Sequence, residues 1–181
     1  MSTNSNICKL MADGSVKSIY CHWDGYIEHN GRILNQYYRD PQKVEQLLSL
    51  GDISVLGEKV NASEAVEKYG FSYYFNAKFQ ELSEQEQERL DKESREHVIA
   101  YHRDRGERLQ IKTYLDLEDF IMSEHEFQEF VYIMLPKNGA DLCSTNSKDW
   151  KWFVWYDTGI HAVGDLDLFP LEENLSNLPK L

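Results

Sequence analysis

Short apolar runs with strand character alternate with capped helical segments along this chain, and that alternation restricts the fold to a mixed α and β architecture. Residues 16–23, VKSIYCHW, are rich in β-branched and aromatic side chains and predict a strand. Residues 38–52 predict a helix, because Asp40 is a suitable N-cap, Pro41 suits the first helical position, and Gly51 follows the last apolar residue. The rest of the chain follows the same alternation.

The same signals predict the remaining elements. We expect helices at 61–70, with Asn61 as the cap, at 83–96, and around 117–121. We expect strands at 97–102, 129–135 and 150–157, a strand or extended loop at 71–79, and a hairpin turn or mobile loop at 136–149. Together they predict one α+β domain over residues 1–181, with a mixed or mainly antiparallel sheet, short helices packed on it and one polar surface helix. Residues 1–13 are expected to form a flexible N-terminal segment and residues 171–181 a C-terminal tail.

Three of the four tryptophans lie within six residues of one predicted strand. Side chains alternate along a strand, so Trp150 and Trp152 should share one face of the sheet and Trp155 should lie on the other. Two arrangements remain open. Either both faces are covered and all three rings are buried, or one face presents an aromatic patch suited to a protein interface.

Negative charge is the strongest compositional signal, since 31 acidic and 19 basic side chains give a net charge of −12. Carboxylates concentrate in the polar helix near 84–93 and in the segment 116–129. Such fields repel nucleic acid and attract basic protein surfaces, although acidic surfaces also keep proteins soluble. The candidate partner-binding residues are Glu84, Glu88, Asp91, Glu118, Asp119 and Glu124.

The only basic concentration lies in the segment 101–112. Its candidate contacts to nucleic acid or to a partner are Tyr101, Arg103, Arg105 and Arg108. Arginines at alternating positions of an extended segment would follow phosphates, with Tyr101 beside them for stacking. Asp104 and Glu107 are interleaved with these arginines, so internal ion pairs explain the same pattern and are the preferred interpretation.

The CHWD sequence at residues 21–24 contains side chains that occur in metal and catalytic sites. Cys21 and His22 are adjacent on a predicted strand and should point to opposite faces, so they do not suit one metal ion. A site built from His22, Asp24 and His29 matches no established ligand spacing. We therefore expect no metal, no cofactor and no catalytic residue, and interpret the block as a strand that ends in an Asp24-Gly25 turn.

The cysteines and the hydropathy pattern indicate the compartment. Three cysteines without CxxC spacing predict reduced thiols rather than a disulfide framework or a zinc site. The chain has no run of eighteen apolar residues and no secretory leader, which predicts a cytoplasmic protein.

Three blocks of the sequence carry a resemblance to a known family. SIYCHWDGY, LLSLGDISVLGE and AYHRDRGE, in this order and at these separations, resemble small proteins encoded by bacteriophages, prophages and mobile elements of gut bacteria. The resemblance extends from about residue 10 to about residue 156. Where the family commonly has a Pro-Glu-Gly-Val-Gly-like stretch, this chain has IEHNG at 27–31, so the local structure there does not follow from the family.

Some proteins of this kind resemble anti-CRISPR inhibitors, and that likeness implies a function. The expectation is a non-enzymatic phage or mobile-element protein that acts in the bacterial cytoplasm. It would bind and inhibit a host defence nuclease, namely a CRISPR-Cas9 effector with its guide RNA, through acidic surfaces. Two alternatives stay open. One is a metal-dependent or histidine-based small hydrolase that uses His22, Asp24, His29 or His102, and the other is a nucleic-acid-binding module that uses the segment 101–112.

Overall fold

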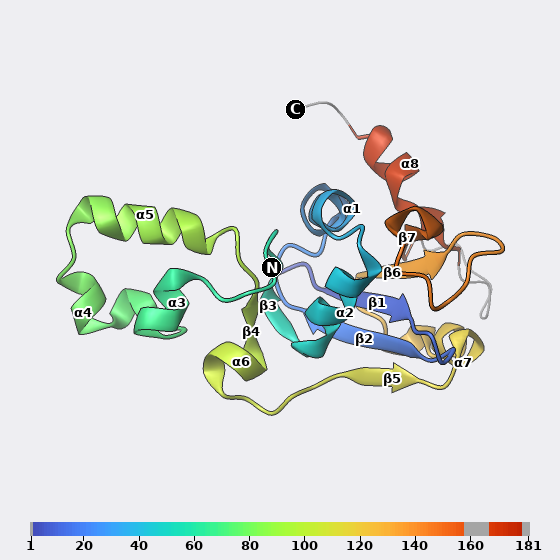
Figure 1. The fold of residues 1–181 in the computed structure, drawn as a ribbon, viewed down its shortest axis with the longest axis horizontal. Coiled ribbons are helices and arrows are strands. Elements are labelled where there is room, and N and C mark those ends of the chain that lie inside the picture. Colours follow the sequence, from blue (N-terminus) through green and yellow to red (C-terminus); the bar gives the residue numbers. More distant parts are fainter. Residues whose placement is uncertain (1, 158–166, 179–181) are drawn as a thin grey trace.

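The centre of the protein is a mixed sheet in which strands from the N-terminal part of the chain pair with strands from the C-terminal part (Figure 1). The computed structural model describes residues 2–157 and 167–178. Within them, eight strands form one open sheet in the order β4-β3-β2-β1-β6-β7-β8, and β5 pairs with β2 beside β3. The strands are β1 Ser5–Leu10, β2 Val16–Cys21, β3 Ile53–Val55, β4 Ile99–Ala100, β5 Lys112–Tyr114, β6 Phe130–Pro136, β7 Trp150–Tyr156 and β8 Phe169–Pro170. The α+β fold class is confirmed.

Helices surround this sheet and also form a separate group at one side of it. The α-helices are α1 Arg32–Tyr37, α2 Pro41–Ser49, α3 Glu64–Tyr69, α4 Ala77–Gln80, α5 Glu84–Ser94, α6 Tyr101–Arg105, α7 Leu117–Met122 and α8 Leu171–Ser176. A π-helical turn, η1 Ile27–Gly31, precedes α1, and 3₁₀ turns occur at η2 Tyr73–Phe75, η3 Glu124–Glu126 and η4 Ser147–Asp149. In the described residues, no helix is long and apolar enough to cross a membrane.

β1 is a central strand, so the prediction of a flexible segment at 1–13 is wrong for residues 5–10. β1 pairs antiparallel with β2 and parallel with β6. Ile7 and Cys8 are both fully buried, on opposite faces of the sheet. The apolar pattern expected of a buried strand is interrupted here by Lys9. Its side chain is nevertheless buried and only 1% exposed. Its ammonium lies 2.9 Å from a carboxylate oxygen of Glu45 and 4.0 Å from the centre of the Trp150 ring.

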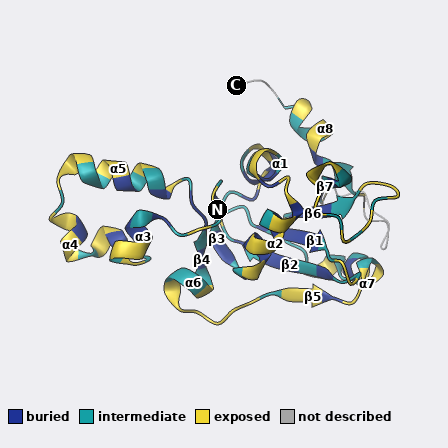
Figure 2. Ribbon diagram, viewed as in Figure 1, coloured by how far each residue is buried: buried dark blue, intermediate teal, exposed yellow. Residues whose placement is uncertain are grey.

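Both faces of the sheet are covered, by different helices. α1, α2 and α8 contribute Leu34, Leu47 and Leu171 to the larger core, which also contains Ile7. α7 contributes Phe120 to the smaller core on the opposite face. In Figure 2 the central strands are therefore largely dark blue, whereas the outer sides of the helices are yellow.

The tryptophans of β7 alternate as the sequence predicts. Trp150 and Trp152 belong to the larger core, and Trp155 belongs to the smaller one. Their exposed fractions are 5%, 4% and 8%. Two-sided burial is confirmed, and the alternative of an aromatic patch on this strand is wrong because helices cover both faces.

The helix ends follow local sequence signals, with one change. The Asp40 side chain accepts a hydrogen bond from the Gln42 amide at 2.9 Å and begins α2. The N-cap of α3 is Ser63 and not the predicted Asn61, because the Ser63 hydroxyl accepts a hydrogen bond from the Val66 amide at 3.2 Å. That hydroxyl is also 3.1 Å from the Ser94 hydroxyl, so the cap joins α3 to the end of α5.

Residues 61–96 form a helical lobe that extends away from the sheet (Figure 1). The predicted strand or extended loop at 71–79 is wrong, because this stretch contains η2 and the start of α4. Tyr73 and Phe79 of this stretch turn inward and pack on the other helices of the lobe. Its core consists of Ala65, Val66, Tyr73, Phe79 and Leu90. This core shares no buried residue with the two cores of the sheet.

The C-terminal part of the chain returns to the sheet. β8 pairs with β7, and α8 packs Leu171, which is fully buried, onto the larger core. The prediction of a tail from residue 171 is therefore wrong for 171–176. The connection at 137–149 joins the antiparallel strands β6 and β7, as predicted for a hairpin, and includes η4.

Candidate functional surfaces

The CHWD block forms a tightly bonded corner between β2 and η1. Asp24 has a positive φ of 56°, and a Cβ on Gly25 would lie 2.6 Å from the backbone carbon of Asn4. Asp24 thus has the left-handed backbone conformation expected of a turn residue, and no larger residue fits at Gly25 without a backbone shift. The buried Asn30 side chain donates a hydrogen bond to the Trp23 carbonyl at 3.2 Å, and the Tyr132 hydroxyl donates one to the Gly25 carbonyl at 2.7 Å.

The side chains of this corner do not form a metal site. The His22 Nδ1 atom lies 2.7 Å from the Tyr20 hydroxyl, and the His29 Nδ1 atom lies 3.0 Å from the Asn30 amide oxygen. His102 lies apart from them on α6, with its Nδ1 atom 2.6 Å from the Glu107 carbonyl. Across the described residues, no three His, Cys, Asp or Glu side chains gather in a way that would hold a metal ion.

Burial disfavours the thiolate form of two of the cysteines. It raises the pKa of Cys8 to about 12 and the pKa of Cys21 to about 11. Cys143 is exposed, and all three are free thiols. Neither buried thiol is suited to act as a nucleophile, because the thiolate is the reactive form.

The predicted strand at 97–102 ends at Ala100, and the basic segment continues as helix α6. The Asp104 carboxylate accepts a hydrogen bond from the Ala100 amide at 2.7 Å, which turns the chain from strand into helix. Gly106 ends the helix with a φ of 69°. The arginines therefore do not alternate along an extended segment, which corrects the geometry assumed for a phosphate-binding track.

Internal contacts hold most of the cationic side chains of this segment. Arg103 forms an ion pair with Asp104 at 2.7 Å and donates hydrogen bonds at 2.6 Å to the Val60 and Val98 carbonyls. Arg105 pairs with Glu107 at 3.0 Å. The guanidinium of Arg105 also lies 5.4 Å from the centre of the Tyr101 ring. The preferred interpretation of internal ion pairs is confirmed for these two arginines, while Arg108 is exposed at the surface.

The two predicted acidic surfaces lie at different ends of the molecule, α5 in the helical lobe and α7 beyond β5 (Figure 1). On α5, Glu84 and Glu88 are exposed and form no ion pair within the described part of the chain. Asp91 is mainly structural, since it pairs with Arg95 at 2.6 Å and accepts a hydrogen bond from the Tyr73 hydroxyl at 3.1 Å.

The second acidic surface combines exposed carboxylates with exposed apolar groups. Glu118 is exposed on α7, and Glu124 is half-buried on η3. The Asp119 carboxylate is used locally, because it accepts a hydrogen bond from the Leu115 amide at 2.8 Å. Leu115 and Met122 are 84% and 62% exposed. This surface is therefore less acidic and more apolar than the sequence indicates.

Tyr74 and Phe75 are exposed at η2 of the helical lobe and were not predicted as surface residues. Phe75 is 91% exposed and Tyr74 is 49% exposed, although Tyr74 stacks on Tyr73 with ring centres 4.3 Å apart. The FSYYF sequence shows an apolar run, but its alternation indicates a strand and not a turn with outward aromatic groups.

Comparison with known proteins gave no match to a family model, to a curated protein or to a solved structure.

Proposed function

We propose that this chain is a non-catalytic phage or mobile-element protein that binds a host defence nuclease and inhibits it by occupying a basic surface. The partner that the family resemblance implies is a CRISPR-Cas9 effector loaded with guide RNA. The observation that carries the proposal is the helical lobe, which has its own small core and exposes unpaired carboxylates on α5 and aromatic side chains at η2.

The exposed carboxylates of the lobe share one helix face. Glu84 and Glu88 are separated by four residues on α5, so their side chains lie on the same side of the helix together with Gln87. Neither carboxylate is neutralised by a neighbouring cation in the described residues, whereas Arg89 is occupied by Glu64 and Glu86. The face is therefore a source of negative potential.

Side-chain hydrogen bonds link α5 to the turn that carries the exposed aromatic residues. The Gln87 side chain donates a hydrogen bond to the Gln80 carbonyl at 3.4 Å, and the Gln80 side chain donates one to the Tyr74 carbonyl at 2.5 Å. These two bonds connect the acidic face of α5 to η2, where Phe75 is exposed. Exposed aromatic residues beside charged groups are typical of the residues that dominate binding energy in protein interfaces.

Charge complementarity favours a basic partner. A Cas9-type effector holds nucleic acid in a positively charged channel, and exposed carboxylates are complementary in charge to such a channel. Attraction between surfaces of opposite charge raises association rates, most strongly at low ionic strength. An inhibitor of this kind needs no bond-making chemistry, only occupancy of the channel or of a surface that must move before cleavage.

The test is inhibition of target-DNA cleavage by a guide-loaded Cas9, with affinity measured at low and at high ionic strength. The variant Glu84→Lys with Glu88→Lys should bind more weakly, and its loss should be larger at low ionic strength. Asp91 is left unchanged because it stabilises the lobe. The matched control is Glu28→Lys with Glu173→Lys, two exposed carboxylates elsewhere that make the same change in net charge.

Three outcomes would count against the proposal. The first is the absence of binding and inhibition by the native chain. The second is an affinity of the lobe variant that equals that of the native chain at both ionic strengths. The third is an equal loss in the control variant, which would indicate that net charge alone is responsible.

A further inference from the structure

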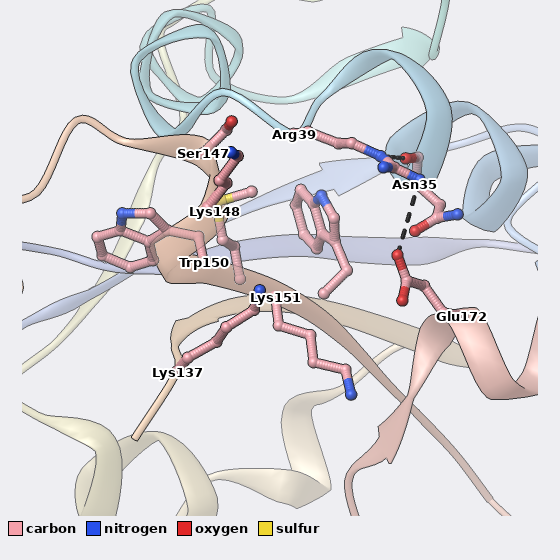
Figure 3. Close-up of a pocket in the computed structure, with 10 residues that line it drawn as sticks. Asn35, Arg39, Lys137, Ser147, Lys148, Trp150, Lys151 and Glu172 are labelled. Carbon is pink, nitrogen blue, oxygen red and sulfur yellow. Dashed lines mark hydrogen bonds and ion pairs between the residues drawn. The ribbon is translucent and has the colours of Figure 1, made fainter. Parts of the chain in front are cut away.

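The protein contains a basic pocket on the side of the sheet opposite α7 (Figure 3). It has a volume of about 320 Å³ and lies between α1, the β6–β7 connection and α8. This volume is within the range of pockets that bind small molecules. We define the basic pocket by its ten lining residues, which are Asn35, Arg39, Met134, Lys137, Ser147, Lys148, Trp150, Lys151, Trp152 and Glu172.

The charge of this pocket is opposite to that of the protein. Four of its lining residues are cationic and one, Glu172, is acidic, whereas the whole chain carries a net charge of −12. In Figure 3, Arg39 and Glu172 lie on one side of the pocket, and Lys137 and Lys148 lie on the other. The cations come from three separate parts of the chain, so no local sequence pattern accounts for their convergence.

Lys137 and Lys148 have no acidic partner within the described residues, unlike Arg89, Arg103 and Arg105. The Lys151 ammonium does not face the pocket, because it lies 5.8 Å from the centre of the Phe153 ring, on the face of β7 opposite Trp150 and Trp152. Arg39 has a weak partner, since its guanidinium lies 3.7 Å from the Glu172 carboxylate and both side chains are mainly exposed. The charges of Lys137, Lys148 and Arg39 are therefore available to an anionic ligand.

The remaining lining residues provide uncharged contacts. Trp150, Trp152 and Met134 are almost completely buried and give the pocket an apolar base. The Asn35 side-chain amide and the Ser147 hydroxyl, which also line it, make no hydrogen bond to the described residues. Apolar and aromatic walls with a few convergent polar groups are typical of small-molecule sites, and lysines are frequent ligands of phosphate.

We propose that the basic pocket binds a mononucleotide. Lys137, Lys148 and Arg39 bind its phosphates, and the small exposed parts of Trp150 and Trp152 contact its planar ring. This site is separate from the acidic face of α5 and does not depend on the function proposed above. It also differs from the segment 101–112, because none of the residues of that segment lines it.

The test is isothermal titration of the full chain with ATP, and in parallel with pyrophosphate, adenosine and a short single-stranded DNA. We expect ATP to bind with a Kd below about 1 mM. Pyrophosphate should bind more weakly than ATP, and adenosine more weakly still, because phosphate contacts supply most of the affinity. Lys137→Ala with Lys148→Ala should weaken ATP binding by about ten-fold or more. The control Lys78→Ala with Lys92→Ala changes two exposed lysines of the helical lobe and should leave ATP binding unchanged.

A second variant predicts a gain of affinity, which misfolding cannot produce. Glu172→Gln removes the only carboxylate of the pocket and frees Arg39, so ATP should bind about two- to five-fold more tightly. Glu173→Gln, on the same helix but outside the pocket, should have no effect. The proposal is overturned if ATP does not bind, if adenosine binds as tightly as ATP, if only the DNA binds, or if both variant pairs behave alike.

Discussion

Leu90 tests whether the helical lobe is an independent cooperative unit. Its side chain is 1% exposed and belongs to the five-residue core that the lobe shares with neither core of the sheet. Replacing a buried leucine by alanine removes its transfer free energy and leaves a cavity, which together cost about 2–5 kcal/mol. We therefore expect a loss of about 3 kcal/mol for Leu90→Ala.

Whether the loss of stability in Leu90→Ala is confined to the lobe or extends to the sheet distinguishes a separately unfolding lobe from a single cooperative fold. If the lobe opens on its own, a loss of about 3 kcal/mol accelerates its amide exchange by roughly a hundred-fold. The strands β1, β6 and β7 should keep their protection. Leu34→Ala, in the larger core of the sheet, is the matched control and should lower protection in the strands as well.

Hydrogen exchange followed by mass spectrometry measures both regions in one experiment. Peptides from residues 61–96 report on the lobe, and peptides from β1 and β6 report on the sheet. Equal loss of protection in lobe and sheet for Leu90→Ala would refute the independence of the lobe. Unchanged exchange in the lobe would refute the assignment of its stability to this small core.

Three further perturbations test the sheet and its buried groups. Burial raises the pKa of the Asp52 carboxyl above its ordinary value of 3.8, because the charged form is disfavoured in the folded protein. Ionisation of Asp52 therefore opposes folding. The folded protein is most stable with respect to this group at low pH, and that stability is lost as the pH rises through the raised pKa. Asp52→Asn should therefore be more stable than the native chain at neutral pH, and lower stability in a urea titration would contradict this. With a thiol reagent at neutral pH, Cys143 should react rapidly, whereas Cys8 and Cys21 should react only after denaturation; three rapid thiols in the folded protein would count against their burial. Gly25→Ala should lower the free energy of unfolding by about 1–3 kcal/mol, measured by thermal denaturation, because the added Cβ meets the backbone of the chain that enters β1; an unchanged Tm would contradict it.

The acidic composition of the chain has two structural consequences. Many carboxylates are used internally, as Asp104, Asp119 and Asp91 show by holding backbone or side-chain donors. Only part of the negative charge is therefore available to a partner, and Glu84 and Glu88 form its clearest exposed group. A charge count from sequence overestimates such a surface because it includes carboxylates that act as caps and ion-pair partners.

The sequence by itself determined the local features of this protein. Asp40, Ser83 and Gly51 act on amides and backbone angles within a few residues, so their roles at helix ends follow from neighbouring letters. The alternation of the tryptophans in β7 is equally local, because successive side chains of any strand point to opposite faces. These features depend on the geometry of one element and on nothing distant.

Only the tertiary structure decided which elements meet, and with them the candidate sites. β1 is central because it pairs with β6, more than 120 residues away, and its buried Lys9 hides the apolar pattern. The basic pocket brings Arg39, Lys148 and Glu172 together from three distant segments. Packing across the sheet determines which segments meet. Local sequence does not distinguish one possible strand partner from another, and the free energy of burying apolar surface selects among them.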